Sequence, residues 1–270
     1  MNRIDTRLTQ LAARGRKALV PFVTAGDPSL EATVPVMHAL AAAGADIIEL
    51  GVAFSDPMAD GPTIQRSSEN ALARGAGLGF VFECVRGFRE RDDATPVVLM
   101  GYLNPVEIRG PERFAREAVA AGVDGVLLVD LPPEEAAEFR AAFAPHGLAL
   151  ILLAAPTTSD ARMAQLCAGA AGYLYYVSFA GVTGAAGLDT GAASDRLHRI
   201  RARSPVPVMA GFGIKDAATA AAMAREADGV VVGSALVAAI TGAADPGDAA
   251  RRAGDFLAPL RSALDALSPA

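Results

Sequence analysis

Cysteine and histidine are scarce in this 270-residue chain, and their placement excludes several kinds of chemistry. The two cysteines, Cys84 and Cys167, lie far apart among apolar neighbours, which favours core thiols in a reducing cytosol over a disulfide framework. The three histidines, His38, His146 and His198, share no metal-ligand spacing. No Gly-x-Ser-x-Gly turn or nucleophilic Cys–His arrangement is found either. We therefore expect neither a metal site nor a serine or cysteine nucleophile.

Positive charge is also limited. The chain has 24 Lys and Arg against 30 Asp and Glu, a formal net charge of −6, so it has no electrostatic reason to bind nucleic acid or an anionic membrane. The N-terminus lacks the apolar core of a signal peptide, and Ile4, Leu8 and Leu11 instead fall on one stripe of an amphipathic helix. Residues 163–188 carry no charge, but glycines interrupt them, which indicates helix, strand and loop in place of a membrane span. We expect a soluble, cytoplasmic protein.

Short apolar runs alternate with helical patterns along almost the whole chain. The predicted strands are Ala18–Thr24, Asp46–Leu50, Pro96–Met100, Gly125–Asp130, Leu148–Leu153, Gly172–Ser178, Val206–Gly211 and Gly229–Gly233. The predicted helices between them are Leu30–Ala43, Phe80–Arg91, Glu112–Ala121, Pro133–Ala144, Asp160–Ala168, Ala192–Ala202 and Asp216–Arg225. Strands that are apolar on both faces and separated by amphipathic helices indicate a parallel sheet with right-handed crossovers.

Eight strands in a chain of this length favour an α/β fold in which residues 1–270 form a single (β/α)8 barrel domain. The N-terminal helix and a short helix after the eighth strand would be additions to it. An open doubly wound sheet is the alternative, but no Gly-x-Gly-x-x-Gly follows the first strand. Leucines at helical spacing near the C-terminus predict a closing helix, bent or restarted at Pro259.

The stretch IELGVAFSDPMADGPTIQ at 48–65 places an acid at the end of a core strand. Because side chains alternate along a strand, Ile47, Glu49 and Gly51 share one face, and Ile48 and Leu50 share the other. The two aliphatic residues suit the helix-facing side, so Glu49 points inward at the C-terminal mouth, where barrel enzymes keep their chemistry. Desolvation there raises the pKa of a carboxyl group and suits it to proton transfer near neutral pH. The alternative is a structural acid held by backbone N–H groups or an arginine.

The loop after this strand carries two more acids. It is long for a βα connection, and long ordered loops in compact domains are usually functional. Pro57 and Pro62 stiffen the loop and Gly61 lets it turn, so Asp60 can be held over the mouth. Asp56, directly before Pro57, is interpreted as a turn-capping or surface residue. Asp60 is therefore the second candidate catalytic acid.

Glycine-rich loops follow the last three predicted strands, with the sequences SFAGVTGAAG at 178–187, AGFGIKD at 210–216 and VGSALVAAI at 232–240. Ser234 follows Gly233 at the start of a short helix, where free N–H groups and the helix dipole favour an anion. Barrels often bind phosphate with the loops after strands seven and eight, so we expect a phosphate site here. Lys215 could be proposed as a Schiff-base lysine, but a solvated lysine beside Asp216 is the better interpretation.

Tyr173, Tyr175 and Val177 share strand parity and are expected to face the barrel interior. They could simply fill the barrel. Alternatively, the phenol of Tyr175 could line a pocket for a flat aromatic substrate and donate a hydrogen bond. The residues alone leave both interpretations open.

The motifs resemble those of the tryptophan synthase alpha subunit family. The stretch at 48–65 is similar to the family signature ELGxPFSDPxADGPxIQ. The similarity continues in chain order through PFVTAGDP at 21–28, MGYLNPV at 100–106, VDLPPEE at 129–135, APTT at 155–158, GVTGA at 181–185, GFGI at 211–214 and GSA at 233–235. The resemblance implies a (β/α)8 barrel that cleaves indole-3-glycerol phosphate to indole and glyceraldehyde 3-phosphate, a retro-aldol reaction without a cofactor.

The resemblance also implies a role for individual residues. Glu49 would move protons at indole C3 and at the departing hydroxyl, and Asp60 would bind the indole N–H and stabilise the positive charge that develops there. The residues that would line the indole and glycerol pocket are Phe22, Tyr102, Leu127, Tyr175 and Phe212. Thr183 would belong to the closing loop that meets Asp60. The phosphate cradle would consist of Gly184, Gly213, Gly233 and Ser234.

A partner is implied as well. The family works with a pyridoxal-phosphate beta subunit in an αββα complex and passes indole to it through a tunnel. Asp56, Pro57 and the loop around Asn104 and Pro105 would then belong to the interface, which agrees with the non-catalytic interpretation of Asp56.

The sequence departs from the family pattern at two places. Ala53 stands where the signature usually has Pro, which should loosen the start of the acid-bearing loop. Phe179 and Ala180 stand where the closing loop often has Arg and Thr or Ser. That puts a loop-closing salt bridge or hydroxyl contact from these two positions in doubt.

Two competing functions have to be weighed. An indole-glycerol-phosphate synthase or a phosphoribosylanthranilate isomerase would also be a phosphate-binding barrel, but those sites rely on lysine, cysteine or acids on other strands. The only lysines here are Lys17 and Lys215, which argues against the synthase. A catalytically silent barrel that only activates a partner would need neither Glu49 nor Asp60, and the chain has both.

Overall fold

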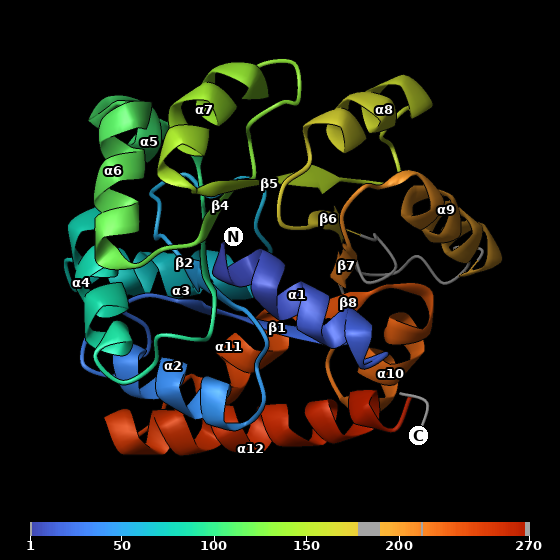
Figure 1. The fold of residues 1–270 in the computed structure, drawn as a ribbon. Helices are drawn as coiled ribbons and strands as arrows, with labels where there is room; N and C mark the ends of the chain where they lie inside the picture. The colour runs from blue at the N-terminus through green and yellow to red at the C-terminus, as the bar shows by residue number, and fades with distance from the viewer. Residues whose placement is uncertain (1, 178–189, 212, 268–270) are drawn as a thin grey trace.

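Eight parallel strands form a closed barrel in the computed structural model, which describes residues 2–177, 190–211 and 213–267 (Figure 1). The strands are β1 (Ala18–Thr24), β2 (Ile48–Gly51), β3 (Val97–Gly101), β4 (Gly125–Leu128), β5 (Ala149–Ala154), β6 (Leu174–Val177), β7 (Val208–Gly211) and β8 (Gly229–Val232). Each strand pairs with the next, and β8 pairs back with β1, where Ala18 lies opposite Gly229. The predicted (β/α)8 barrel is confirmed; the first strand has the predicted bounds, and the ends of the other seven differ from the predicted ones by at most two residues.

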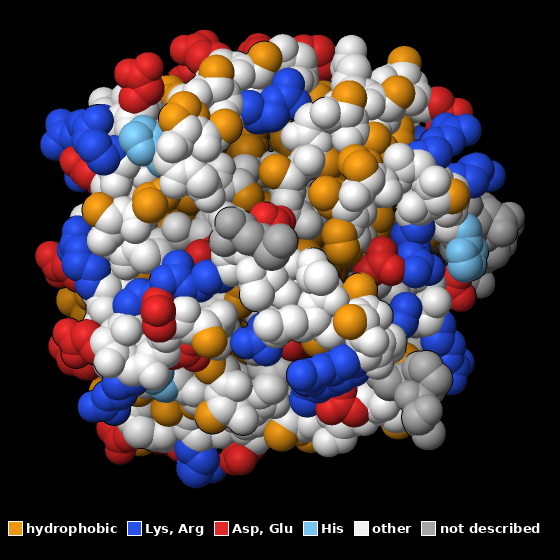
Figure 2. All heavy atoms as spheres, viewed as in Figure 1, with side chains coloured by type: hydrophobic (Ala, Val, Ile, Leu, Met, Phe, Trp, Pro, Cys, Tyr) orange, Lys and Arg blue, Asp and Glu red, His pale blue; other side chains and the backbone are white. Residues whose placement is uncertain are grey.

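Helices cover the outside of the barrel. They are α1 (Arg3–Ala13), α2 (Thr33–Ala42), α3 (Pro62–Ala73), α4 (Leu78–Arg89), α5 (Leu103–Arg109), α6 (Pro111–Ala121), α7 (Ala136–Phe143), α8 (Asp160–Gly169), α9 (Thr190–Arg203), α10 (Ala217–Glu226), α11 (Ser234–Ile240) and α12 (Pro246–Asp265), with a 3₁₀ turn η1 (Ala144–His146). Within the described residues, no helix is both long enough and apolar enough to cross a membrane. Charged side chains of both signs surround one face of the molecule, whose middle is mostly uncharged (Figure 2).

Two helices and one boundary differ from the sequence predictions. Helices α3 and α5 were not predicted, because prolines near their starts, Pro62 and Pro105, are typical of loops. Proline is also favoured in the first turn of a helix, where its missing N–H has no intrahelical partner to lose, and Pro62 is the first residue of α3. The restart expected at Pro259 is wrong: α12 continues through it to Asp265, packed along α2.

Side-chain alternation divides the core into two clusters. Ile48 and Leu50 belong to the outer cluster, between the sheet and the helices, and Ile47 belongs to the inner cluster. Every strand except β2 contributes to the inner cluster, and Ile47 directly precedes β2. The members from the strands include Val20, Val98, Leu127, Ile151, Tyr175, Met209 and Val231, and Tyr173 joins them just before β6. Helix α1 crosses the N-terminal end of the barrel and adds three buried side chains to this cluster, namely Ile4, Leu8 and Leu11 (Figure 1). The predicted amphipathic N-terminal helix therefore closes the floor of the barrel.

An aspartate recurs at the N-terminal end of three strands. Each carboxylate accepts the N–H of the preceding strand and an arginine N–H from a helix. The three sets are Asp46 with Leu19 N (3.0 Å) and Arg261 Nη1 (2.9 Å), Asp124 with Val97 N (2.9 Å) and Arg89 Nη2 (2.7 Å), and Asp228 with Val208 N (2.9 Å) and Arg201 Nη2 (2.6 Å). Each set ties two neighbouring strands to a helix at the end of the barrel remote from the C-terminal mouth.

The Asp124 set should contribute measurably to stability. Asp124→Ala removes the acceptor of Arg89 Nη2 and of the Val97 N–H in a buried setting and leaves the Arg89 charge without its carboxylate, so the free energy of unfolding should fall by about 3 kcal/mol. Urea unfolding followed by circular dichroism measures this change. Asp93→Ala is the matched control, because Asp93 also pairs with Arg3 but is exposed, and it should leave stability almost unchanged. Equal losses in the two variants would contradict the assigned role.

Candidate active site

Glu49 is the second residue of β2 and lies on its inner face. It is opposite Phe22 on β1 and Val98 on β3, and its side chain is fully buried. The Tyr173 hydroxyl on β6 donates a hydrogen bond to Glu49 Oε1 at 2.6 Å. Glu49 Oε2 has no hydrogen-bond partner among the described residues. One carboxylate oxygen is therefore held in place, and the other is left inside the barrel for an additional partner.

Burial sets the proton affinity of this carboxyl group. Desolvation raises the pKa of Glu49 to about 7, and the hydrogen bond from Tyr173 opposes this rise only in part. Burial, together with the negative charge of Glu49, also raises the pKa of Tyr173 well above its ordinary value, so the phenol keeps its proton. Glu49 is thus divided between its acid and base forms near neutral pH, as the sequence analysis expected for a carboxyl group at this position.

Asp60 lies in the loop that joins β2 to α3 and is tied to the next βα connection. Tyr102, just after β3, donates its hydroxyl to Asp60 Oδ2 at 3.0 Å and accepts the Ala59 N–H at 2.9 Å. The Tyr102 ring stacks on Phe54 with ring centroids 4.9 Å apart. Burial raises the pKa of Asp60, and the hydrogen bond from Tyr102 lowers it. A single tyrosine therefore holds both the backbone and the carboxylate of the acid-bearing segment.

The start of this loop is packed in spite of its unusual residue. Ala53, which stands where the family signature has Pro, is buried and clusters with Ala71 of α3 and Ala76. Gln65 adds a hydrogen bond from Nε2 to the Asp60 carbonyl at 2.8 Å. Small side chains at the base and hydrogen bonds near the tip thus fix the segment without a proline ring at position 53.

The remaining pocket candidates fall into three groups. Phe22, Leu127 and Tyr175 are buried, and Leu127 and Tyr175 lie in the inner cluster. Tyr102 is the second group and lines a small cavity together with Asp60 and Phe22. The third group lies outside the described residues and consists of Thr183, Gly184 and Phe212, together with the unusual Phe179 and Ala180.

The charges of both Glu49 and Asp60 act on the Tyr175 hydroxyl. Burial raises the pKa of Tyr175, and the charges of Glu49 and Asp60 raise it further. A Cβ atom at Gly211 on β7 would lie 2.2 Å from the Tyr175 hydroxyl, so only glycine leaves room for this ring. A phenol that keeps its proton and lies near both carboxylates is available as a hydrogen-bond donor, but it is equally part of the packed interior.

The candidates for anion binding are close to this pocket. Gly233 is the N-cap of α11, and Ser234, which is exposed, is the first residue of that helix. A Cβ atom at Gly233 would lie 3.6 Å from Phe22, which places this helix start beside the pocket wall. Gly213, after β7, has a φ of +70°, a conformation that side-chain-bearing residues rarely adopt. Gly213, Gly233 and Ser234 thus follow the C-terminal ends of β7 and β8.

Sequence reasoning missed two features of the site. Tyr173 was expected to face inward, but nothing in the sequence pairs it with Glu49, 124 residues away. Thr24 is buried at the end of β1, opposite Gly51, and its hydroxyl has no partner among the described residues. Its signal is the alternation along β1, which places Val20, Phe22 and Thr24 on one face.

Metal and thiol chemistry find no support in the described part of the chain. It contains no group of three or more His, Cys, Asp or Glu side chains placed to hold a metal ion. Both cysteines are free, and burial raises the pKa of the Cys84 thiol to about 12, which leaves it protonated and unreactive.

Comparisons with known proteins bear on this geometry. The sequence pattern of the family described as tryptophan synthase alpha chain matches residues 8–261. The chain belongs to the tryptophan synthase alpha chain family. A tryptophan synthase alpha chain of Xanthomonas oryzae pv. oryzae is 72% identical over 98% of this chain and 99% of its own length, and one from Xanthomonas campestris pv. campestris is 71% identical over 98% of each.

Solved structures agree with this assignment. Tryptophan synthase subunit alpha from Legionella pneumophila str. Paris superposes with a TM-score of 0.92 at 47% identity and covers 99% of this chain and 100% of its own. A chain of the tryptophan synthase α2β2 complex from Pyrococcus furiosus gives a TM-score of 0.84 at 39% identity, with 91% and 98% covered. Alpha chains of this family cleave indole-3-glycerol phosphate to indole and glyceraldehyde 3-phosphate in tryptophan biosynthesis, and this carbon–carbon lyase reaction is the activity of the chain.

The Glu49–Tyr173 hydrogen bond should be visible in the pH dependence of cleavage. Tyr173→Phe removes the donor that favours the carboxylate, so the pKa of Glu49 should rise further above about 7. The pH at which kcat/KM changes with this ionisation should move upward by about one unit. Tyr176→Phe is the matched control, because the buried Tyr176 hydroxyl has no hydrogen-bond partner within the described part of the chain and its ring packs in the outer cluster. An unchanged pH dependence of kcat/KM in Tyr173→Phe would show that this hydrogen bond does not set the pKa of Glu49.

Proposed function

We propose that Glu49 is the acid–base group of the lyase reaction. In the cleavage, the bond between indole C3 and the glycerol chain breaks, its electron pair returns to the indole ring, C3 gains a proton and the adjacent hydroxyl loses one. In net terms a proton thus moves from the hydroxyl to C3. One carboxyl group can donate a proton to C3 and accept the proton of the hydroxyl. The observation that carries this proposal is the complete burial of Glu49, which raises its pKa to about 7 and suits it to both steps.

We assign Asp60 the stabilisation of the charge that develops on the indole. Protonation of C3 makes the ring nitrogen cationic, and a carboxylate that accepts its N–H hydrogen bond stabilises this state most where water is excluded. Tyr102 supports the assignment because it fixes the Asp60 carboxylate through Oδ2 and the preceding backbone through Ala59 N. The group is therefore oriented before the substrate arrives and needs little reorganisation during the reaction.

The rest of the pocket would recognise the two ends of the substrate. Phe22, Leu127 and Tyr175 offer buried apolar surface for the indole ring next to Glu49, and Tyr102 stands at the Asp60 side. Gly213, Gly233 and Ser234 would hold the phosphate with backbone N–H groups and a hydroxyl at the start of α11. Thr183, Gly184 and Phe212, which lie outside the described residues, complete the proposed set.

The C-terminal face also offers a surface for a beta subunit. Met58, after β2, is 84% exposed, and Ile108 on α5, after β3, is 80% exposed. The hydrogen bond between Tyr102 and Ala59 joins these two connections, so both apolar side chains border the same mouth. The related alpha chain of Pyrococcus furiosus occurs in an α2β2 complex. We therefore propose an αββα assembly in the cytoplasm, in which indole passes from the mouth directly to a pyridoxal-phosphate beta subunit.

Glu49→Gln tests the central assignment. The variant should lose cleavage of indole-3-glycerol phosphate by about 10³-fold or more, because Gln neither donates nor accepts the proton. Indole release is measured with and without a beta subunit, and activation of that subunit should persist because the partner surface is unchanged. Near-normal turnover would remove Glu49 from the mechanism and favour a silent regulatory barrel.

The same variant should be more stable than the parent chain at high pH. The pKa of Glu49 is raised from 4.5 to about 7 in the folded state, so its favourable contribution is present below pH 4.5 and is lost as the pH rises through 7. Above pH 7, Glu49→Gln should therefore gain about 3 kcal/mol in the free energy of unfolding, and this gain should vanish near pH 4.5. Urea unfolding at both pH values measures it, and a gain that does not depend on pH would contradict the ionisation as its cause.

Asp60→Asn isolates the second acid. The amide keeps the shape of the side chain but carries no negative charge to stabilise the positive charge on the indole, so kcat should fall by about 10² to 10³-fold. Asp56→Asn is the control, since Asp56 lies in the same loop, is exposed, and its carboxylate accepts a hydrogen bond from the neighbouring Ser55 hydroxyl. If the two variants lose activity equally, the effect belongs to the loop and not to the carboxylate of Asp60.

A further inference from the structure

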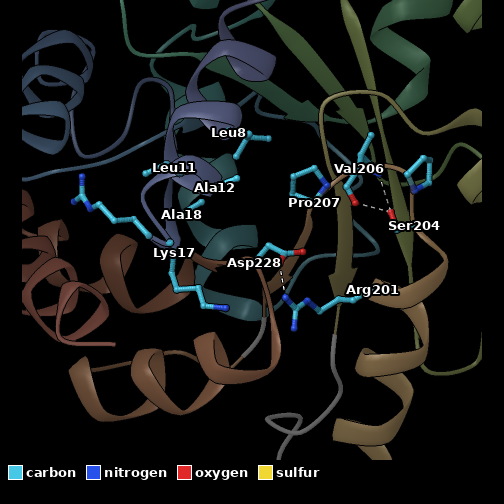
Figure 3. A pocket seen from close by; sticks show the side chains of 13 residues that line it. Leu8, Leu11, Ala12, Lys17, Ala18, Arg201, Ser204, Val206, Pro207 and Asp228 are labelled. Carbon is cyan, nitrogen blue, oxygen red and sulfur yellow. Dashed lines mark hydrogen bonds and ion pairs between the residues drawn. The ribbon is translucent and has the colours of Figure 1, made fainter. Parts of the chain in front are cut away.

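A second pocket lies at the opposite end of the barrel from Glu49. It has a volume of about 460 Å³, within the range of small-molecule sites, and opens between α1 and the turn that joins α9 to β7 (Figure 3). Ala18 at the start of β1, Pro207 before β7 and Asp228 before β8 place it at the N-terminal ends of these strands. The lyase chemistry proposed above does not use this end of the molecule.

One side of the pocket is apolar. Leu8, Leu11 and Ala12 of α1 face Val206 and Pro207 across it, as Figure 3 shows. Ser204, on the same side as Val206, is already satisfied, because its hydroxyl donates to the Val206 carbonyl at 2.6 Å. This part of the pocket therefore favours an apolar group and offers little competition from unsatisfied polar atoms.

The other side carries one positive charge without a matching carboxylate. Four charged residues line the pocket, and two of the cations are paired: Arg201 bonds to Asp228 at 2.6 Å, and Arg16 bonds to Asp265 at 2.9 Å. Lys17 Nζ instead donates to the Ala227 carbonyl at 2.6 Å, and no described carboxylate lies within ion-pair distance of it. Its ammonium has three donors, so two remain for another acceptor.

The charges around Lys17 act on its pKa in both directions. Partial burial lowers the pKa of Lys17, and the charge of Arg201 lowers it further, while the charges of Asp228 and Glu226 raise it. In Figure 3 the ends of Lys17 and Arg201 flank Asp228 on the same side of the pocket.

We propose that this pocket binds a small monoanionic carboxylate with a compact apolar body. The carboxylate would accept hydrogen bonds from the Lys17 ammonium, and the apolar body would lie between α1 and the turn at 204–207. A single negative charge matches the single cation that lacks a carboxylate partner, which favours a carboxylate over a phosphate dianion. The site is separate from the mouth and from the proposed phosphate cradle.

Cyclohexanecarboxylate is a suitable probe, and cyclohexylmethanol is its uncharged counterpart. Amide NMR spectra of the ¹⁵N-labelled chain should show saturable shifts at residues 8–18 and 201–208 with a dissociation constant on the order of millimolar. Lys17→Gln should weaken this binding about tenfold or more, and the alcohol should bind the parent chain more weakly by a similar factor. Arg14→Gln removes a nearby exposed charge outside the pocket and should leave the affinity unchanged.

A second pair of variants tests the pocket without touching its charges. Ala12 lines the pocket and is exposed, so Ala12→Phe should fill part of the volume and abolish binding, whereas Ala13→Phe on the neighbouring exposed position should not. Lyase turnover and the thermal midpoint, measured for every variant, show whether the fold is intact. Equal binding of acid and alcohol, an unchanged affinity in Lys17→Gln, or shifts confined to the mouth around Glu49 would overturn the proposal.

Discussion

The burial of a single carboxyl group inside a closed sheet is the constraint on which the site depends. In a barrel every strand has two neighbours, so backbone N–H groups are used in the ladders and the inner face offers only side chains. Among the residues that the structure describes, the Glu49 carboxyl group therefore accepts one hydrogen bond, from Tyr173, where a carboxylate at a helix start or in a loop would accept several. The effect of desolvation is larger than that of this hydrogen bond, so the pKa of Glu49 rises to about 7. The reactivity of this group follows from the closure of the fold.

The N-terminal end of the barrel treats buried acids differently. Asp46, Asp124 and Asp228 precede their strands, where a backbone N–H of the neighbouring strand is still available, and each also meets an arginine. Burial raises the pKa of Asp124 as it does that of Glu49, but the Val97 N–H and two arginines oppose it. The same carboxylate chemistry thus fixes strands at one end and stays reactive at the other, depending on which donors the backbone geometry leaves within reach.

Alternation along a strand predicts which face each side chain occupies, but it does not predict which side chains meet across the barrel. The inward direction of Glu49 follows from Ile48 and Leu50 beside it, because a period of two needs only neighbouring residues. Its contact with Tyr173 joins β2 to β6, and parity shows only that both point inward, not that they meet. Helix α3 was missed for another reason: Pro62 is typical of both a rigid loop and a helix start, and only the packing of Ala71 against Ala53 distinguishes them.

Helix α1 belongs both to the inner core and to the pocket at the N-terminal end of the barrel. One face of it contributes Ile4, Leu8 and Leu11 to the inner cluster that includes Tyr173, while Ala12 and its neighbours line the pocket at the N-terminal end. Tyr173 is fully buried in that cluster and donates to Glu49, so its ring position depends on the floor that α1 provides. Because a packed core has few voids to absorb a displacement, a shift of α1 would reach Tyr173 before it reached any group at the mouth. The helix that closes the barrel is therefore also part of the support for its reactive acid.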